Sequence, residues 1–197
     1  TAPGVNGHTA ERDQRMPYDP EMSKKLLAEA GYPDGFELTL DCPNDRYIND
    51  EAICVAAIGM FAKIGVKVNL DAKTKSQHFS EVKEGDANGM TSDMYMLGWG
   101  VPTFDSHYVY SYLFDSAGSW NKVNFSNARV DELVAAMGVE TDLDKRNAMI
   151  AEAWDITQDD VTYLPLHHQV VNQASKGNVD VPIRMNNEPL FRFANVN

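Results

Sequence analysis

The sequence predicts an α/β fold from three observations. Two segments with apolar residues at helical spacing end at Gly31 and Gly65, and an alternating, strand-like segment follows each of them. This alternation of helix and strand is typical of α/β domains and not of helical bundles or sandwiches. The composition agrees, because 43% of the 197 residues are hydrophobic and 23% are charged, as in an ordinary packed protein.

The first half of the chain supplies these elements in order. Asp19 is a suitable N-cap and Pro20 a suitable first residue for a helix that ends at Gly31. Alternating apolar residues over 36–40 predict a half-buried strand, and residues 42–50 form a polar loop. The next helix carries apolar residues from 53 to 64 and leads into a second alternating strand that begins at Val66.

The middle of the chain is expected to hold a short helix over 77–84, a loop over 85–92 and a third strand over 94–99. Apolar residues are consecutive in this third strand, so we expect it to be central in its sheet. Beyond it, two interpretations stay open for residues 108–114. The alternating aromatic residues fit a strand, whereas the spacing of Tyr108 and Tyr112 fits a helix.

The last part is expected to contain two helices and a strand. Ser126 is the expected N-cap of a helix that ends at Gly138, and Asp142 opens the next helix. Residues 161–166 predict a strand, and the final thirty residues predict short strand-like pieces and turns. We expect an α/β domain with a mixed sheet flanked by helices.

Charge and motif content exclude several classes of protein. The formal net charge is −12, which makes nucleic acid an unsuitable partner. No apolar run approaches the roughly 18 residues of a membrane span. The five histidines lack metal-ligand spacing, and neither a GxSxG nor a GxxxxGK[ST] motif is present. We therefore predict no metal, no cofactor and no catalytic residues.

Aromatic residues are concentrated between residues 95 and 125, where nine of the 19 in the chain lie. The tripeptide Gly98-Trp99-Gly100 stands at the end of the third strand. Ligands of open α/β sheets bind beyond the carboxyl ends of the strands, so this segment is a candidate small-molecule surface. The alternative is that these rings are ordinary core residues.

Arg46 follows the first strand, which is again a carboxyl-end position. An arginine there can bind a carboxylate through two parallel hydrogen bonds, or it can be an ordinary solvent-exposed or helix-capping residue. Cys42 and Cys54 flank the same loop, twelve residues apart. They are a possible disulfide in an oxidising compartment and two buried thiols in a reducing one.

Five segments in order resemble the extracytoplasmic solute-binding proteins of peptide/nickel-type ABC transporters, bacterial extracellular solute-binding protein family 5. These segments are residues 17–35, 62–68, 97–100, 125–133 and 163–167. The resemblance covers nearly the whole chain. It implies a single lobe of a periplasmic-binding-protein type II-like fold.

Family members are much longer, and the resemblance is to their C-terminal part only. It implies a linker from a missing N-terminal lobe at 1–16 and a C-terminal ligand-binding lobe at 17–162. Residues 163–197 would then be a return segment that leads back to the other lobe. The absence of an initial methionine agrees with a truncated piece.

The resemblance also implies a function. A peptide or another small carboxylate-bearing solute is captured between two lobes and delivered to an ABC permease of the inner membrane. The protein is then periplasmic or extracytoplasmic, with a possible lipid anchor at the missing N-terminus, and it is not an enzyme. The alternatives are a protein-interaction module with an exposed aromatic patch over residues 108–125 and, less favoured, a hydrolase.

The resemblance suggests individual ligand contacts. Arg46 lies in a Pro-x-x-Arg pattern like the one whose arginine holds the peptide carboxylate, and Trp99 matches the tryptophan that lines the pocket. Peptide-binding members have an aspartate for the ligand ammonium three residues after that tryptophan, where this chain has Pro102. The next acid, Asp105, is either a displaced ammonium anchor or a helix N-cap. The expected ligand-binding set is Arg46, Tyr47, Gly98, Trp99, Gly100, Phe104 and Asp105.

Overall fold

The computed structural model describes residues 1–14, 16–84, 92–170, 172, 174–184 and 188–196. The chain divides into two compact units. One unit comprises Arg15–Trp99, and the other comprises Thr1–Gln14 together with Gly100–Asn197. The predicted loop at 85–92 lies, except for Ser92, outside the described residues.

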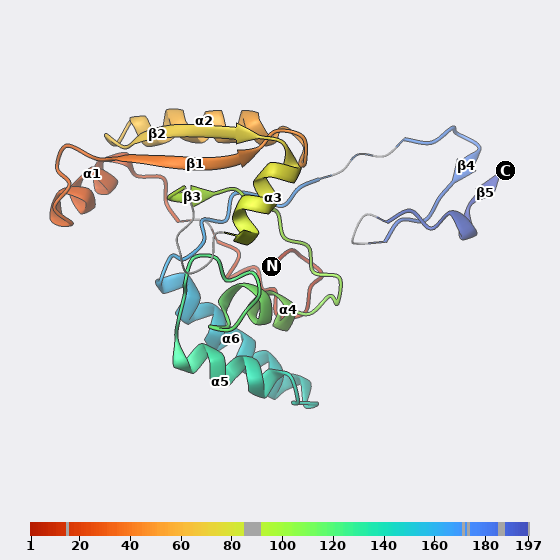
Figure 1. Ribbon diagram of the computed structural model, residues 1–197. Helices are drawn as coiled ribbons and strands as arrows, with labels where there is room; N and C mark the ends of the chain where they lie inside the picture. Colours follow the sequence, from red (N-terminus) through yellow and green to blue (C-terminus); the bar gives the residue numbers. More distant parts are fainter. Residues whose placement is uncertain (15, 85–91, 171, 173, 185–187, 197) are drawn as a thin grey trace. The chain divides into compact units, whose positions relative to one another are not determined.

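The unit Arg15–Trp99 is built on a three-stranded sheet with the order β2-β1-β3 (Figure 1). Its strands are β1 (Glu37–Pro43), β2 (Lys67–Lys73) and β3 (Met94–Tyr95), and β1 pairs with both neighbours in parallel. The register aligns Glu37 with Lys67 and Pro43 with Lys73. The α/β class predicted from the sequence is confirmed. Antiparallel pairing occurs separately, in the other unit, between β4 and β5.

The expectation that the third strand is central is wrong for the described sheet. β3 has only two residues and lies at an edge, whereas β1 is central. The apolar run over 94–99 leaves the sheet after Tyr95, and it is β1 that is buried along most of its length. Local apolar content does not fix strand order, because strand order depends on which strands pair.

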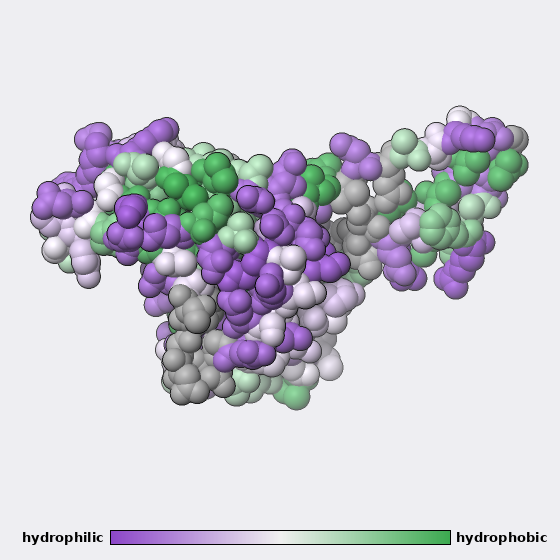
Figure 2. Space-filling model, turned by 45° about the horizontal axis from the view of Figure 1, so that its top comes forward, coloured by the Kyte–Doolittle hydropathy of each residue, from purple (hydrophilic) through white to green (hydrophobic). Residues whose placement is uncertain are grey.

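Three helices accompany this sheet: α1 (Pro20–Glu29), α2 (Asp50–Ala62) and α3 (Lys75–Glu84). The Asp19 carboxylate accepts a hydrogen bond of 2.9 Å from the Met22 N–H, which confirms the predicted N-cap. No residue of α1 is buried. On α2, Val55 and Met60 are exposed. Figure 2 shows that the surface of the molecule carries green hydrophobic areas among purple hydrophilic ones.

Side chains of β1 alternate between the two faces of the sheet. Leu38, Leu40 and Cys42 join Cys54 of α2 in one buried cluster. Asp41 faces the other way, and its carboxylate lies 2.8 Å from Nδ1 of His78 on α3. The helices α2 and α3 therefore cover opposite faces of β1, as is usual for a parallel sheet.

The other unit is mainly helical. It contains α4 (His107–Val109), the π-helix η1 (Tyr110–Phe114), α5 (Ala128–Met137) and α6 (Leu143–Asp159). Residues 108–114 are thus helical, so the helical interpretation holds and the strand interpretation does not. The core of this unit is formed by Tyr110, Phe125, Val130, Leu133, Val134, Met137, Ile150 and Ala153.

Two local expectations for this unit are wrong. The N-cap of α5 is Asn127 and not Ser126, because the Asn127 side chain accepts hydrogen bonds from the Arg129 and Val130 N–H groups. Residues 161–166 form no strand, since they have no strand partner among the described residues. Asp142 does cap α6, accepting from the Asp144 and Lys145 N–H groups.

Short elements occur near the end of the chain, as expected. They are β4 (Val179–Asp180), the 3-10 helix η2 (Phe191–Phe193) and β5 (Asn195–Val196). Among the described residues, no helix is long and apolar enough to cross a membrane.

Candidate functional site

The carboxyl ends of three parallel strands meet at one edge of the sheet in the unit Arg15–Trp99. The loop at 44–49 follows β1, Thr74 follows β2, and residues 96–99 follow β3. Four of the predicted contacts, Arg46, Tyr47, Gly98 and Trp99, lie in these segments. This is the edge at which open α/β sheets bind ligands.

The loop at 44–49, which we call the Arg46 loop, is held in place by the buried carboxylate of Asp50. Asp50 is 4% exposed, and its Oδ2 accepts hydrogen bonds from the backbone N–H groups of Arg46 (2.8 Å) and Tyr47 (2.9 Å). Burial alone would raise the pKa of Asp50, but the backbone hydrogen bonds outweigh it and lower the pKa. The carboxylate is therefore ionised at neutral pH.

The Arg46 side chain itself is exposed. Its guanidinium carbon lies 5.0 Å from the centre of the Tyr47 ring, within the range of a cation–π contact. Within the described part of the chain, no ion pair involves this guanidinium. Its charge is thus not neutralised by a described carboxylate and can meet an external one.

Tyr47 connects the Arg46 loop to the segment that follows β3. Its hydroxyl accepts a hydrogen bond of 2.9 Å from the Gly98 N–H and donates one of 3.3 Å to the Gly98 carbonyl. Residue 98 must be small here, because a Cβ atom would lie 2.6 Å from the Tyr47 ring. The structure therefore brings two of the predicted residues into direct contact.

Cys42 and Cys54 form a disulfide with an S–S distance of 2.03 Å. Both residues are almost fully buried. The bond joins the end of β1 to the first half of α2. The Arg46 loop lies between the two cysteines and is therefore part of the ring that the disulfide closes.

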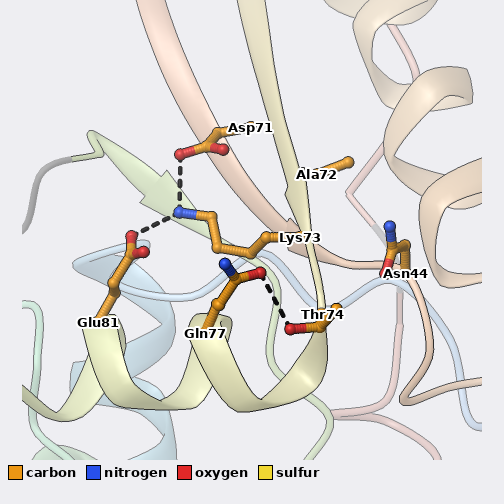
Figure 3. Close-up of a pocket in the computed structure, with 7 residues that line it drawn as sticks. All are labelled: Asn44, Asp71, Ala72, Lys73, Thr74, Gln77 and Glu81. Carbon is orange, nitrogen blue, oxygen red and sulfur yellow. Dashed lines mark hydrogen bonds and ion pairs between the residues drawn. The ribbon is translucent and has the colours of Figure 1, made fainter.

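A polar pocket of 470 Å³ opens at the same edge of this unit (Figure 3). It is lined by Asn44, Asp71, Ala72, Lys73, Thr74, Gln77 and Glu81. The Lys73 ammonium lies 2.7 Å from Asp71, 2.5 Å from Glu81 and 3.4 Å from Asp41. Burial alone would lower the pKa of Lys73, but these carboxylates outweigh it and raise the pKa.

This charged cluster around Lys73 was not among the features predicted from the sequence. The signal is present in part, since Asp71 and Lys73 are two residues apart and so share one face of a strand. Glu81 and Asp41 come from other elements, however, and only the fold brings them to Lys73. Among the described residues, no group of His, Cys, Asp or Glu is arranged to hold a metal ion.

The remaining predicted contacts, Gly100, Phe104 and Asp105, belong to the other unit. The Asp105 carboxylate pairs with Arg146 through Nη2 (2.8 Å) and Nε (3.2 Å). It also accepts hydrogen bonds from the Asn6 amide (3.0 Å) and the His107 N–H (2.9 Å). Partial burial alone would raise the pKa of Asp105, yet the hydrogen bonds, above all from Arg146, lower it.

The Asp105 carboxylate is thus bonded to partners within its own unit, and its contact with a ligand stays a prediction. The N-cap of α4 is the next residue, Ser106, so Asp105 is not the helix N-cap of the alternative interpretation. Some aromatic residues of the segment 95–125 belong to the core, in agreement with the alternative that these rings are ordinary core residues. Tyr110 and Phe125 are buried, and the Phe114 ring packs edge-on against Phe125 with centroids 5.6 Å apart. Phe104 has a positive φ of 54° and accepts a backbone hydrogen bond from Asn6.

The class of protein follows from comparison with known families. Residues 1–121 match the model of the bacterial extracellular solute-binding proteins, family 5 Middle. The chain therefore belongs to this family of solute-binding proteins.

Individual members of known function are similar to this chain over most of its length. The chain is 30% identical over 161 residues to the glutathione-binding protein GsiB of Salmonella typhimurium, covering 80% of this chain and 31% of that protein. It is 34% identical over 163 residues to heme-binding protein A of Haemophilus influenzae, covering 80% and 29%. The chain thus spans about a third of the length of these relatives.

Solved structures show the same fold. A dipeptide-binding protein from Pseudoalteromonas sp. SM9913, in complex with Met-Leu, matches with a TM-score of 0.79 and 23% identity. That match covers all of this chain and 39% of the other. The periplasmic binding protein DppA from Helicobacter pylori, in complex with the peptide STSA, matches with a TM-score of 0.72 and 23% identity, covering 84% and 31%.

Proposed function

We propose that this chain is part of the solute-binding component of an ABC importer and that its solute is peptide-like or another small carboxylate-bearing compound. The observation that carries the proposal is the exposed Arg46 guanidinium at the carboxyl edge of the sheet, with no ion pair among the described residues. Family membership supports the solute-binding role.

Arg46 supplies charge specificity in this proposal. A guanidinium can donate two parallel hydrogen bonds to a carboxylate, which gives direction as well as strength. The ring of Tyr47 already contacts Arg46, and Trp99 would add apolar contact area to the same surface. Gly98 holds the Tyr47 side chain in this place, because its N–H and its carbonyl both bond the Tyr47 hydroxyl. Binding is expected to need no chemical step, so the protein is proposed not to be an enzyme.

The wider mechanism is also proposed. The ligand is enclosed between this lobe, residues 17–162, and a second lobe, and it shifts the population toward a closed form. The closed form then delivers the solute to the permease outside the cytoplasm, in the periplasm or on the cell exterior. Residues 1–16 and 163–197 would connect the two lobes.

Thermal unfolding of the full-length protein with candidate solutes tests the proposal. Met-Leu and glutathione are the first probes, because relatives with these ligands in their descriptions share the fold or the family. A ligand that binds the folded state only stabilises it by about 2.7 kcal/mol at a hundredfold excess over Kd. We expect a rise in Tm that Arg46→Ala abolishes.

Lys25→Ala is the matched control, since Lys25 is an exposed cation on α1 of the same unit and has no described contact with the Arg46 loop. Stabilisation that persists in Arg46→Ala would refute Arg46 as the carboxylate anchor. No stabilisation by any carboxylate-bearing probe would refute the proposed solute class and favour the protein-interaction alternative.

A further inference from the structure

The Arg46 loop is held by Asp50, the first residue of α2, whose side chain bonds the loop backbone. Asn49, in the N-cap position, has a left-handed φ of 59° and makes no side-chain cap hydrogen bond. Asp50, one residue further on, directs its Oδ2 backward to the N–H groups of Arg46 and Tyr47. Its second oxygen accepts from the Glu51 N–H at 3.0 Å. One buried carboxylate thus joins the loop to the helix.

The loop has two further attachments. Before it, the Cys42–Cys54 disulfide links the end of β1 to α2. Within it, the Asp45 carboxylate accepts a hydrogen bond of 2.5 Å from the Lys75 N–H at the start of α3. The loop backbone is therefore tied to both helices that cover the sheet, while the Arg46 side chain stays exposed.

We propose that Asp50 and the Cys42–Cys54 disulfide are positioning groups for solute binding, holding the Arg46 loop in its binding geometry before the ligand arrives. The inference rests on the proposed role of Arg46. Ordering a loop on binding reduces affinity, so a loop that is already ordered binds more tightly. Neither group contacts the ligand. Each acts through the backbone that bears Arg46.

A double-mutant cycle in the full-length protein tests this inference. The variants are Asp50→Asn, Arg46→Ala and their combination, and the probes are Met-Leu and its C-terminal amide. The amide lacks the carboxylate that Arg46 would bind. We expect Asp50→Asn to weaken Met-Leu binding about tenfold, equivalent to about 1.4 kcal/mol. It should have little effect on the amide and no further effect in the Arg46→Ala background.

Asp142→Asn is the matched control. Asp142 also accepts hydrogen bonds from two backbone N–H groups, those of Asp144 and Lys145, but at the start of α6 in the other unit. Its loss can destabilise the protein, but it should not couple to Arg46. Replacing both cysteines by serine should reproduce the Asp50→Asn pattern, and so should reduction of the disulfide by dithiothreitol.

Amide hydrogen exchange adds a readout that needs no ligand. The N–H groups of Arg46 and Tyr47 should be protected in the wild type and should exchange at least tenfold faster in Asp50→Asn. Unchanged protection overturns the inference. Equal weakening of Met-Leu and its amide also overturns it. If Arg46→Ala alone leaves binding unchanged, Arg46 is not the carboxylate anchor and the inference fails with that role. If Arg46→Ala weakens binding strongly and the two substitutions are additive, only the inference is refuted.

Discussion

At the scale of single residues, Gly98 lies too close to Tyr47 to carry a side chain without a shift of the Tyr47 ring. A Cβ atom at this position would lie 2.6 Å from the Tyr47 ring, and the Tyr47 hydroxyl bonds both polar groups of the Gly98 backbone. A side chain at residue 98 must therefore move the ring and break these hydrogen bonds.

Gly98→Ala is expected to lower the free energy of unfolding by about 1 kcal/mol, the net value of a typical intramolecular hydrogen bond. Urea unfolding measures the change. Gly100→Ala is the control, because nothing lies within 4 Å of the position its Cβ would take. Equal stabilities of the two variants would contradict the role of the Tyr47–Gly98 contact.

Asp105 gives a pH prediction. Its pKa is lowered in the folded protein, so its contribution to stability is present above the unfolded pKa of about 4 and is lost as the pH falls through the folded pKa. Asp105→Asn should lower the free energy of unfolding by about 2 kcal/mol at pH 7, and by less at lower pH. Unfolding free energies measured from pH 7 down to pH 2 test this. A constant difference across that range would show that the ionised carboxylate is not responsible.

At the scale of elements, the start of α5 shows how two neighbouring cap residues are distinguished. Ser126 and Asn127 are both good N-caps by residue type. In the structure Asn127 is extended, with φ −145° and ψ 112°, and its side chain reaches the first free N–H groups of the helix. The hydroxyl of the adjacent Ser126 lies instead 3.4 Å from the Ser116 hydroxyl.

Asn127→Ala should therefore destabilise the protein by about 1 kcal/mol, whereas Ser126→Ala should change stability by less than about 0.5 kcal/mol. Thermal unfolding of both variants makes the comparison. The reverse order would restore Ser126 as the cap.

At the scale of the whole molecule, two hydrophobic cores lie in two units. Leu40 belongs to the core around β1, and Met137 belongs to the core around α5 and α6. The two cores share no residue. A substitution in one core should therefore destabilise its own unit first.

Leu40→Ala and Met137→Ala should each cost about 2–5 kcal/mol, the usual range for removing a large buried side chain. Hydrogen exchange should locate the damage. Leu40→Ala is expected to accelerate exchange in β1 more than in α5, and Met137→Ala the opposite. Uniform acceleration in both variants would mean that the two units unfold as one.

Local chemistry explains which features could be predicted. Asp19, Pro20 and Gly31 mark the first helix, because the residues that begin and end a helix act on neighbouring residues in the sequence. The α/β class follows from the same periodic patterns, and four candidate contacts follow from their place after strands. Two of the three wrong expectations, a central third strand and a strand at 161–166, concern pairing between distant segments. The third, Ser126 as the N-cap of α5, is a local error of one residue.

The sequence by itself thus determined the α/β class, the family, most helices and the position of Arg46 after a strand. Only the tertiary structure decided that β1 is central, that Asp105 faces Arg146, and that Asp41, Asp71 and Glu81 surround Lys73. The reason is physical. Caps and periodicity are interactions over a few residues, whereas strand order and charge pairing depend on which distant segments the chain brings together when it buries its core.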